Sequence, residues 1–304
     1  MNLPKIGWIG TGIMGTAMCR RLMEAGYSCT VYSRTQVKAY SLLDCGACWA
    51  ETPAEVARQS DIIFTMVGYP TDVEQVILAP ENGVLAGCRT ENSTEITENN
   101  SPRKIIVDMT TSRPSLAEKI ASCAAKKGVS ALDAPVSGGD IGAKNGTLSI
   151  MVGGYRETFD ALCPIWEILG KTIHYQGGPG MGQHTKMMNQ ILIAGTMLGM
   201  CEALRYAQCV GLDVPHALKS VSTGAAGSWS LTNLAPRVLR DDFAPGFKIT
   251  HFVKDLRIAL DEAYARNLQI PGVELAERLY SELQDAGLAD AGTQALVQWP
   301  KKGE

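Results

Sequence analysis

The sequence predicts an α/β domain with a mainly parallel sheet, followed by a domain built of helices only. In the first half, short apolar runs alternate with helical patterns, whereas the last third shows helical patterns alone. Strands that alternate with helices favour right-handed βαβ units and therefore a parallel sheet. A chain of 304 residues is long enough for two domains, which we place at residues 1–180 and 181–304.

The elements of the first domain follow from bounded apolar runs and from apolar residues at helical spacing. Between Gly87 and Lys104 the chain turns polar and has no apolar period, so a surface excursion is expected there. The expected strands are 5–9, 29–32, 61–67, 105–108 and 129–132, and the expected helices start near residue 13, near 35 and at Pro114.

The second domain should begin with one long helix, from about Gln183 to Val210. Its side chains are apolar almost all round, so it should be buried between domains or between subunits. That burial also favours a homodimer or a homotetramer. Further helical patterns cover residues 214–222, 228–239, 250–266 and 273–285.

Composition argues against several classes of function. The chain has 28 Lys and Arg against 31 Asp and Glu, a net charge of −3, so no basic field attracts nucleic acid. No uninterrupted apolar run reaches the roughly 20 residues of a membrane helix. Glycines interrupt the first apolar segment, which therefore does not resemble a signal peptide. We expect a cytoplasmic protein.

The nine cysteines are an odd number in a chain that is large enough to form its core without disulfides, so we expect reduced thiols. Cys45 and Cys48 form the one closely spaced pair. No second pair or suitably spaced histidine accompanies them, so small apolar residues near a turn are expected rather than a metal site.

A glycine-rich turn lies directly between the first strand and the first helix. In a dinucleotide site, the first glycine permits the tight turn, the second lets the backbone approach a pyrophosphate, and the third lets the helix pack on the strand. The helix N-terminus then offers free N–H groups to the phosphates. The position of this turn predicts a Rossmann-type dinucleotide-binding domain. The motif is Gly10, Thr11, Gly12, Ile13, Met14 and Gly15.

The end of the second strand indicates which dinucleotide is bound. Selectivity for NAD usually needs Asp or Glu here, but Ser33, Arg34 and Thr35 stand at this point. A guanidinium can pair with a 2′-phosphate, and the two hydroxyls can donate hydrogen bonds to it. The alternative is an exposed arginine on a turn. We predict that NADP(H) is preferred and that NAD(H) remains possible.

Together with three later motifs, the glycine turn resembles the β-hydroxyacid dehydrogenase family, which includes 3-hydroxyisobutyrate dehydrogenase, tartronate semialdehyde reductase and 6-phosphogluconate dehydrogenase. The similarity extends from about Lys5 to Gln298, with the motifs in the family's order. They are GTGIMG at 10–15, DAPVSGG at 133–139, GMGQHTKMMNQ at 180–190 and KDL at 254–256.

The resemblance implies a site for a small carboxylate substrate. Ser137, Gly138 and Gly139 would bind the carboxylate, and a hydroxyl beside two unobstructed N–H groups suits an anion. Lys186 would be the general acid and base that exchanges a proton with the substrate oxygen. Asn189 and Gln190, on the same helix face, would contact the substrate, although many members carry a second asparagine where this chain has Gln190.

The resemblance also implies further cofactor contacts. Thr111, at the carboxyl end of a strand, would lie near the nicotinamide. Met66 and Val67 would line the dinucleotide, and Lys254 would reach the cofactor from the helical domain. The expected function is hydride transfer between NADP(H) and small β-hydroxy acids or their semialdehydes.

Two alternatives remain open. An imine reductase would share the fold and cofactor, but those enzymes usually carry Asp or Tyr in place of the catalytic lysine, so Lys186 counts against this reading. The other alternative is a non-catalytic dinucleotide-binding module on a dehydrogenase fold, and the intact Lys186, Ser137 and glycine turn argue against such a loss of catalysis. Phosphogluconate is disfavoured, because it needs a larger pocket with cationic phosphate ligands.

Overall fold

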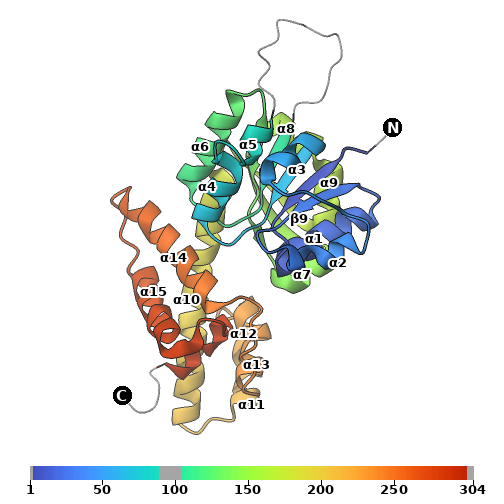
Figure 1. Ribbon diagram of the computed structural model, residues 1–304. Helices are drawn as coiled ribbons and strands as arrows, with labels where there is room; N and C mark the ends of the chain where they lie inside the picture. Colours follow the sequence, from blue (N-terminus) through green and yellow to red (C-terminus); the bar gives the residue numbers. More distant parts are fainter. Residues whose placement is uncertain (1–2, 89–103, 300–304) are drawn as a thin grey trace, which may run out of the picture. The chain divides into compact units, whose positions relative to one another are not determined.

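The computed structural model describes residues 3–88 and 104–299, in two compact units that divide between Lys186 and Met187. The polar segment expected at the surface falls almost wholly on residues 89–103, outside the described residues. Each unit has its own hydrophobic core. Figure 1 draws the first unit mainly in blue and green and the second in yellow to red.

The first unit is built on a sheet of nine described strands in the order β3-β2-β1-β4-β5-β6-β8-β7, with β9 paired to β8. The pairs among β1 to β6 are all parallel, as the alternating pattern predicts. The strands are β1 Ile6–Ile9, β2 Cys29–Tyr32, β3 Cys48–Trp49, β4 Ile62–Thr65, β5 Ile105–Asp108, β6 Ser130–Asp133, β7 Val136–Ser137, β8 Leu148–Gly154 and β9 Gly170–Gly177.

The strands alternate their side chains between two cores, which explains why the parallel strands appear as continuous apolar runs. In β4, Ile62 and Phe64 enter one core, whereas Ile63 enters the other. The first core includes Trp8, which stacks on Phe64 with ring centroids 5.2 Å apart. Helices therefore cover both faces of the sheet (Figure 1).

The helices of this unit begin mostly at prolines or at polar residues that suit a helix start. Thr52 accepts a hydrogen bond from the N–H of Glu55 and so caps α3. Pro53, Pro70 and Pro114 occupy first-turn positions, where no N–H donor is needed. The helices are α1 Ile13–Glu24, η1 Gln36–Ala39, α2 Tyr40–Leu43, α3 Pro53–Gln59, α4 Pro70–Leu78, α5 Val84–Gly87, α6 Pro114–Ala125, α7 Gly139–Asn145, α8 Arg156–Ala161 and α9 Cys163–Leu169.

The second unit is helical, as the loss of strand patterns predicts. Phe252 packs edge-on against Tyr280 with ring centroids 5.0 Å apart, in a core that also holds Met197 and Leu204. Its elements are α10 Met181–Cys209, whose first six residues belong to the first unit, α11 Val214–Val221, α12 Trp229–Asn233, α13 Ala235–Val238, α14 Ile249–Tyr264, α15 Pro271–Leu283, η2 Gln284–Leu288 and η3 Thr293–Gln298.

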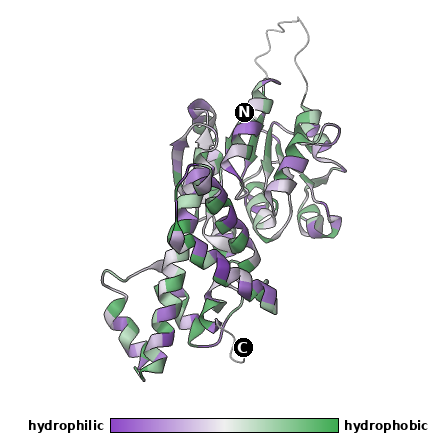
Figure 2. Cartoon of the chain, turned by 90° about the vertical axis from the view of Figure 1, so that its left-hand side faces the viewer, coloured by the Kyte–Doolittle hydropathy of each residue, from purple (hydrophilic) through white to green (hydrophobic). Residues whose placement is uncertain are grey.

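The long helix α10 has one buried and one exposed face within the single chain. Ala194 and Met197 are fully buried, whereas Met188 and Leu192 are 59% and 62% exposed. Green and purple segments alternate along the helices in Figure 2. Within the single chain, α10 is therefore buried on one face. Its length and composition alone would allow it to span a membrane, a test that core helices of soluble proteins also pass.

Candidate active site

The glycine turn between β1 and α1 has three different steric environments. Gly10 has a φ of 98°, and a Cβ there would lie 2.2 Å from the Met66 carbonyl oxygen. A Cβ on Gly15 would lie 2.0 Å from the Gly10 carbonyl oxygen, whereas nothing lies within 4 Å of one on Gly12. Two glycines thus allow close packing, and the third leaves the start of α1 open.

Thr11 has a polar atom with no protein partner at this turn. Its side chain is buried, and its Oγ1 makes no hydrogen bond within the described part of the chain. An unpartnered buried hydroxyl has a free-energy cost that a bound ligand would relieve. The open Gly12 and the Thr11 hydroxyl therefore fit the phosphates of a dinucleotide.

The end of β2 places Ser33 in a buried position and Arg34 in an exposed one. The Arg34 guanidinium pairs with the carboxylate of Asp72 at 3.1 Å, and the N–H of Tyr69 also donates to Asp72, again at 3.1 Å. The sequence analysis missed Asp72, because it arrives from the start of α4. A carboxylate is thus present near the end of β2 although β2 does not supply it.

The ends of β4 and β5 are tied together by hydrogen bonds. The Thr65 hydroxyl donates to Asp108 Oδ1 at 2.7 Å, and the N–H of Val67 donates to the Thr110 hydroxyl at 3.0 Å. The N–H of Thr110 donates to Asp108 as well, at 3.1 Å. Since both strands end at the ligand-binding edge of a parallel sheet, these bonds shape the segment that carries Thr111.

The first turn of α10 is held against this edge by Asp133, the last residue of β6. Its two carboxylate oxygens accept hydrogen bonds from the N–H groups of Gly180 and Gln183, each at 2.8 Å. Burial raises the pKa of Asp133 to about 7, against the opposing effect of the N–H groups of Gly180, Gln183 and Asp133 itself, and nearby Asp108 raises it slightly.

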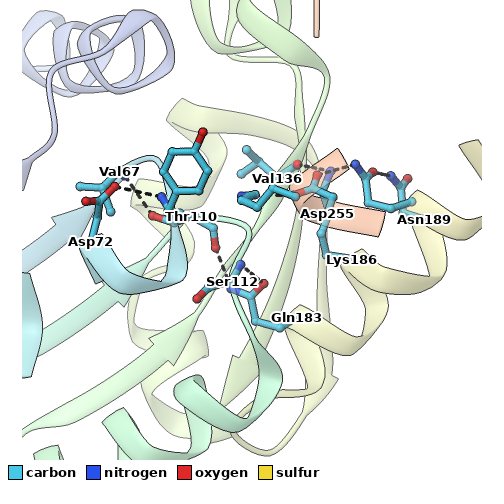
Figure 3. A network of polar contacts seen from close by, with 12 residues as sticks. Val67, Asp72, Thr110, Ser112, Val136, Gln183, Lys186, Asn189 and Asp255 are labelled. Atoms are coloured by element: carbon cyan, nitrogen blue, oxygen red, sulfur yellow. Dashed lines mark hydrogen bonds and ion pairs between the residues drawn. The ribbon is translucent and has the colours of Figure 1, made fainter. Parts of the chain in front are cut away.

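Gln183, which the sequence analysis also missed, connects α10 to the loop after β5. Its Oε1 accepts from the N–H of Ser112 at 2.9 Å, and its Nε2 donates to the Thr110 carbonyl at 2.7 Å (Figure 3). The side chain is fully buried. The sequence signal that could have identified Gln183 is its place as a polar residue one turn before Lys186 in a mostly apolar helix.

Lys186 lies on α10 with its side chain buried, and its Nζ donates to the carbonyl of Val136 at 2.9 Å (Figure 3). Val136 directly precedes Ser137, so this bond brings the amine beside the serine and two glycines of the second motif. Gly138 and Gly139 have φ of 130° and 63°, a conformation that favours glycine and leaves no side chain over the turn.

In the helical unit, three of the predicted residues form a chain of polar contacts with Asp255. Asn189 Nδ2 donates to Gln190 Oε1 at 2.7 Å, and Gln190 Nε2 donates to Asp255 Oδ2 at 2.6 Å. Lys254 Nζ lies 3.1 Å from Asp255 Oδ1. Because Gln190 and Asp255 are both buried, this chain orients the amide of Asn189 and the amine of Lys254.

Cys45 and Cys48 are both exposed free cysteines, and no group of three potential metal ligands occurs among the residues that the structure describes. The edge of the sheet and the start of α10 carry glycine N–H groups, hydroxyls, an amide and a buried amine. Such a set can bind a dinucleotide and a carboxylate and can move one proton.

Comparisons with known proteins agree with a dinucleotide-binding site in this chain. The NAD binding domain of 6-phosphogluconate dehydrogenase matches residues 5–178, and the NAD-binding domain of NADP-dependent 3-hydroxyisobutyrate dehydrogenase matches residues 180–299. The fold and these matches define an NAD(P)-dependent oxidoreductase of hydroxyacids. The chain belongs to the β-hydroxyacid dehydrogenase family.

Individual relatives cover nearly the whole chain. A probable 3-hydroxyisobutyrate dehydrogenase-like protein of Arabidopsis thaliana is 50% identical over 96% of this chain and 84% of its own length. The 2-hydroxy-3-oxopropionate reductase of Escherichia coli is 39% identical over 97% of this chain and 96% of its own length. A structure of 3-hydroxyisobutyrate dehydrogenase with L-serine from Mycobacterium tuberculosis is similar with a TM-score of 0.87 and 25% identity, covering 99% and 100% of the two chains.

The buried carboxyl of Asp133 predicts a specific pH dependence of stability. Its pKa is about 7 in the folded chain against an ordinary value of 3.8, so between these values the folded state binds more protons than the unfolded state. The contribution of Asp133 to the free energy of unfolding should therefore decrease as the pH rises from about 4 to about 7. Urea unfolding of the wild type and of Asp133→Asn at several pH values measures it.

The unfolding free energy of the wild type minus that of Asp133→Asn should decrease as the pH rises from 4 to 7. Asp160→Asn, which removes a carboxylate from an exposed ion pair, controls for general charge effects. A difference that stays constant from pH 4 to pH 7 would contradict the assigned burial effect.

Proposed function

We propose that the protein interconverts small β-hydroxy acids and their semialdehydes, with NADP(H) preferred over NAD(H). The observation that carries the proposal is the buried Lys186 amine at the Val136 carbonyl, next to Ser137. An amine in this place can exchange a proton with an oxygen of a substrate whose carboxylate lies on the adjoining turn.

Residues of the first unit would hold the dinucleotide. Gly10, Gly12 and Gly15 shape the turn for the pyrophosphate, and the unpartnered Thr11 hydroxyl offers it a hydrogen bond. Ile13 and Met14 open the helix behind this turn, while Met66 and Val67 line the site. The cofactor, when bound, supplies or accepts the hydride.

Each substrate group has a matching protein group in this proposal. The Ser137 hydroxyl and the N–H groups of Gly138 and Gly139 bind the carboxylate and orient the molecule. Lys186 donates a proton to the carbonyl oxygen during reduction and removes it during oxidation. Fixed orientation and one proton transfer are all that the protein has to add to hydride transfer.

The helical unit contributes orienting groups. Asn189 hydrogen-bonds the substrate, and Gln190 holds Asn189 in place through the contact at 2.7 Å. Lys254, paired with Asp255, offers a positive charge to the cofactor.

The first unit adds one more cofactor contact. Thr111, from the loop after β5, contacts the nicotinamide.

Arg34 supports the preference for NADP(H). Its guanidinium is largely exposed, and Ser33 and Thr35 flank it with hydroxyl groups. A 2′-phosphate would gain charge-assisted hydrogen bonds there. The family description of residues 180–299, which names an NADP-dependent enzyme, supports the same preference.

We also propose a cytoplasmic homo-oligomer. On the exposed face of α10, Met188, Leu192 and Tyr206 are 59%, 62% and 68% exposed, and a second copy of the chain would remove this apolar surface from water.

The proposed activity is tested by NADPH oxidation with tartronate, methylmalonate and succinic semialdehydes and glyoxylate, with NADH in parallel. We expect turnover with tartronate or methylmalonate semialdehyde and faster turnover with NADPH than with NADH. Tight NADPH binding without turnover of any of them would contradict the substrate class, and turnover of cyclic imines alone would favour an imine reductase.

Replacing the proposed proton donor gives the sharpest test of mechanism. Lys186→Ala should lower kcat about 10²–10⁴-fold, because the general acid is lost, while the Kd for NADPH stays nearly constant. Steady-state kinetics and fluorescence titration measure the two quantities.

Lys104→Met is the matched control, since Lys104 also donates to main-chain carbonyls, those of Ala57 and Ser60. It should leave kcat unchanged. Retention of wild-type kcat in Lys186→Ala would overturn the assignment.

Replacing Arg34 tests the cofactor preference separately. Arg34→Ala should raise the KM for NADPH roughly tenfold through loss of a charge-assisted contact to the 2′-phosphate, and should leave the KM for NADH nearly unchanged. Arg156→Ala, which breaks another exposed ion pair of the same unit, is the control. Equal increases in both KM values on replacing Arg34 would refute the phosphate contact.

A further inference from the structure

Gln183 uses both ends of its carboxamide on the backbone of a single loop. The Oε1 atom accepts from the N–H of Ser112 at 2.9 Å, and Nε2 donates to the carbonyl of Thr110 at 2.7 Å. The side chain is fully buried, so neither loop group has water as a ready substitute partner. These two bonds enclose Thr111, which lies between the bonded residues.

A carboxamide meets both requirements at neutral pH, because it carries a donor and an acceptor on one planar group. A carboxylate accepts hydrogen bonds but cannot donate to the Thr110 carbonyl, and an apolar side chain of the same length can do neither. The main chain of Gln183 is also fixed, because its N–H donates to Asp133 Oδ2 at 2.8 Å. The residue is therefore anchored at both its backbone and its side chain.

The same helix carries Lys186 three residues later, about one turn along α10 and on the same face. Lys186 is itself held by the Val136 carbonyl at 2.9 Å. A displacement of Gln183 would therefore shift the loop around Thr111 relative to the Lys186 amine. An error of about 1 Å in such a geometry can cost roughly 100-fold in rate.

We infer that Gln183 is a positioning residue, which holds the loop on the nicotinamide side at a fixed distance from the proton-donating lysine. This inference rests on the proposed function, because it takes Thr111 as a cofactor contact and Lys186 as the proton donor. Gln183 itself touches neither reacting atom in this assignment, and it acts through the loop and the helix that it joins.

The test compares Gln183→Met with Gln294→Met. Gln294 is an equally buried glutamine, and its Nε2 donates to the carbonyls of Asp242 and Ala244 at 3.1 and 3.2 Å, so it also fastens a loop, but in the helical unit. Both variants should lose thermal stability. Only Gln183→Met should show a lower kcat, by at least about tenfold, with a much smaller change in the substrate KM.

Isotope effects separate positioning from mere stability. With NADPH deuterated at the transferred position, Gln183→Met should show a larger isotope effect on kcat than the wild type, because hydride transfer becomes the slow step. Gln294→Met should show the wild-type value. An unchanged kcat and isotope effect in Gln183→Met, with only a lower Tm, would overturn the inference.

Gln183→Glu keeps the test informative if the methionine variant does not fold. A protonated glutamic acid can still donate to the Thr110 carbonyl, whereas its ionised form repels it. The kcat of this variant should therefore decrease as the pH rises, relative to the wild type at the same pH. A profile parallel to that of the wild type would contradict the role.

Failure of the proposed function can be distinguished from failure of this inference. Suppose that the wild type reduces a semialdehyde and Lys186→Ala does not. A wild-type kcat and isotope effect in Gln183→Met would then refute this inference but not the proposed function. If the wild type reduces none, the emission of bound NADPH provides a readout without substrate. The increase in NADPH emission on binding should then be smaller for Gln183→Met than for the wild type and for Gln294→Met. An equal increase in all three proteins would overturn the inference.

Discussion

The start of α10 depends on one carboxylate at the end of a strand. Asp133 accepts from the N–H groups of Gly180 and Gln183, each at 2.8 Å, and so binds N–H groups that a helix start leaves unpaired. This contact fixes the first turn of α10 on the sheet of its own unit, and the side chains of Gln183 and Lys186 add further bonds to that unit. Lys186 and Gln183 both lie in the first two turns, so their places follow from the same anchor.

This anchor is made of buried polar groups, which are costly unless they are all satisfied. More than one hydrogen bond is formed around it by each of Asp108, Thr110 and Gln183. These bonds restrict the conformation of the loop between β5 and α6. By contrast, the Thr11 hydroxyl has no partner among the described residues. The Ser112 hydroxyl, which belongs to the loop between β5 and α6, likewise has no hydrogen-bond partner among the described residues.

The parallel sheet explains why these groups meet at all. The glycine turn, Arg34, Val67 and Thr110 follow β1, β2, β4 and β5, and the carboxyl ends of those strands share one edge. Asp72 joins them from α4 and pairs with Arg34 at 3.1 Å. Residues separated by dozens of positions in the chain therefore meet at one edge of the sheet, a result of strand order rather than of sequence proximity.

The sequence by itself determined five of the parallel strands, the helical second half and the glycine turn, because apolar periodicity and glycine spacing are local properties. The roles of the later motif residues came from the resemblance to the family. The sequence did not reveal β3, nor β7 and β8, which pair antiparallel to each other, nor β9, which is parallel to β8 with shifts in register. It also did not reveal the exposed face of α10. Asp72, Asp133 and Gln183 gained their roles only in the tertiary structure. The partners that join them to other elements are Arg34, Gly180 and Thr110, which lie 38 to 73 positions away in the chain, and no local pattern encodes a hydrogen bond over such a separation.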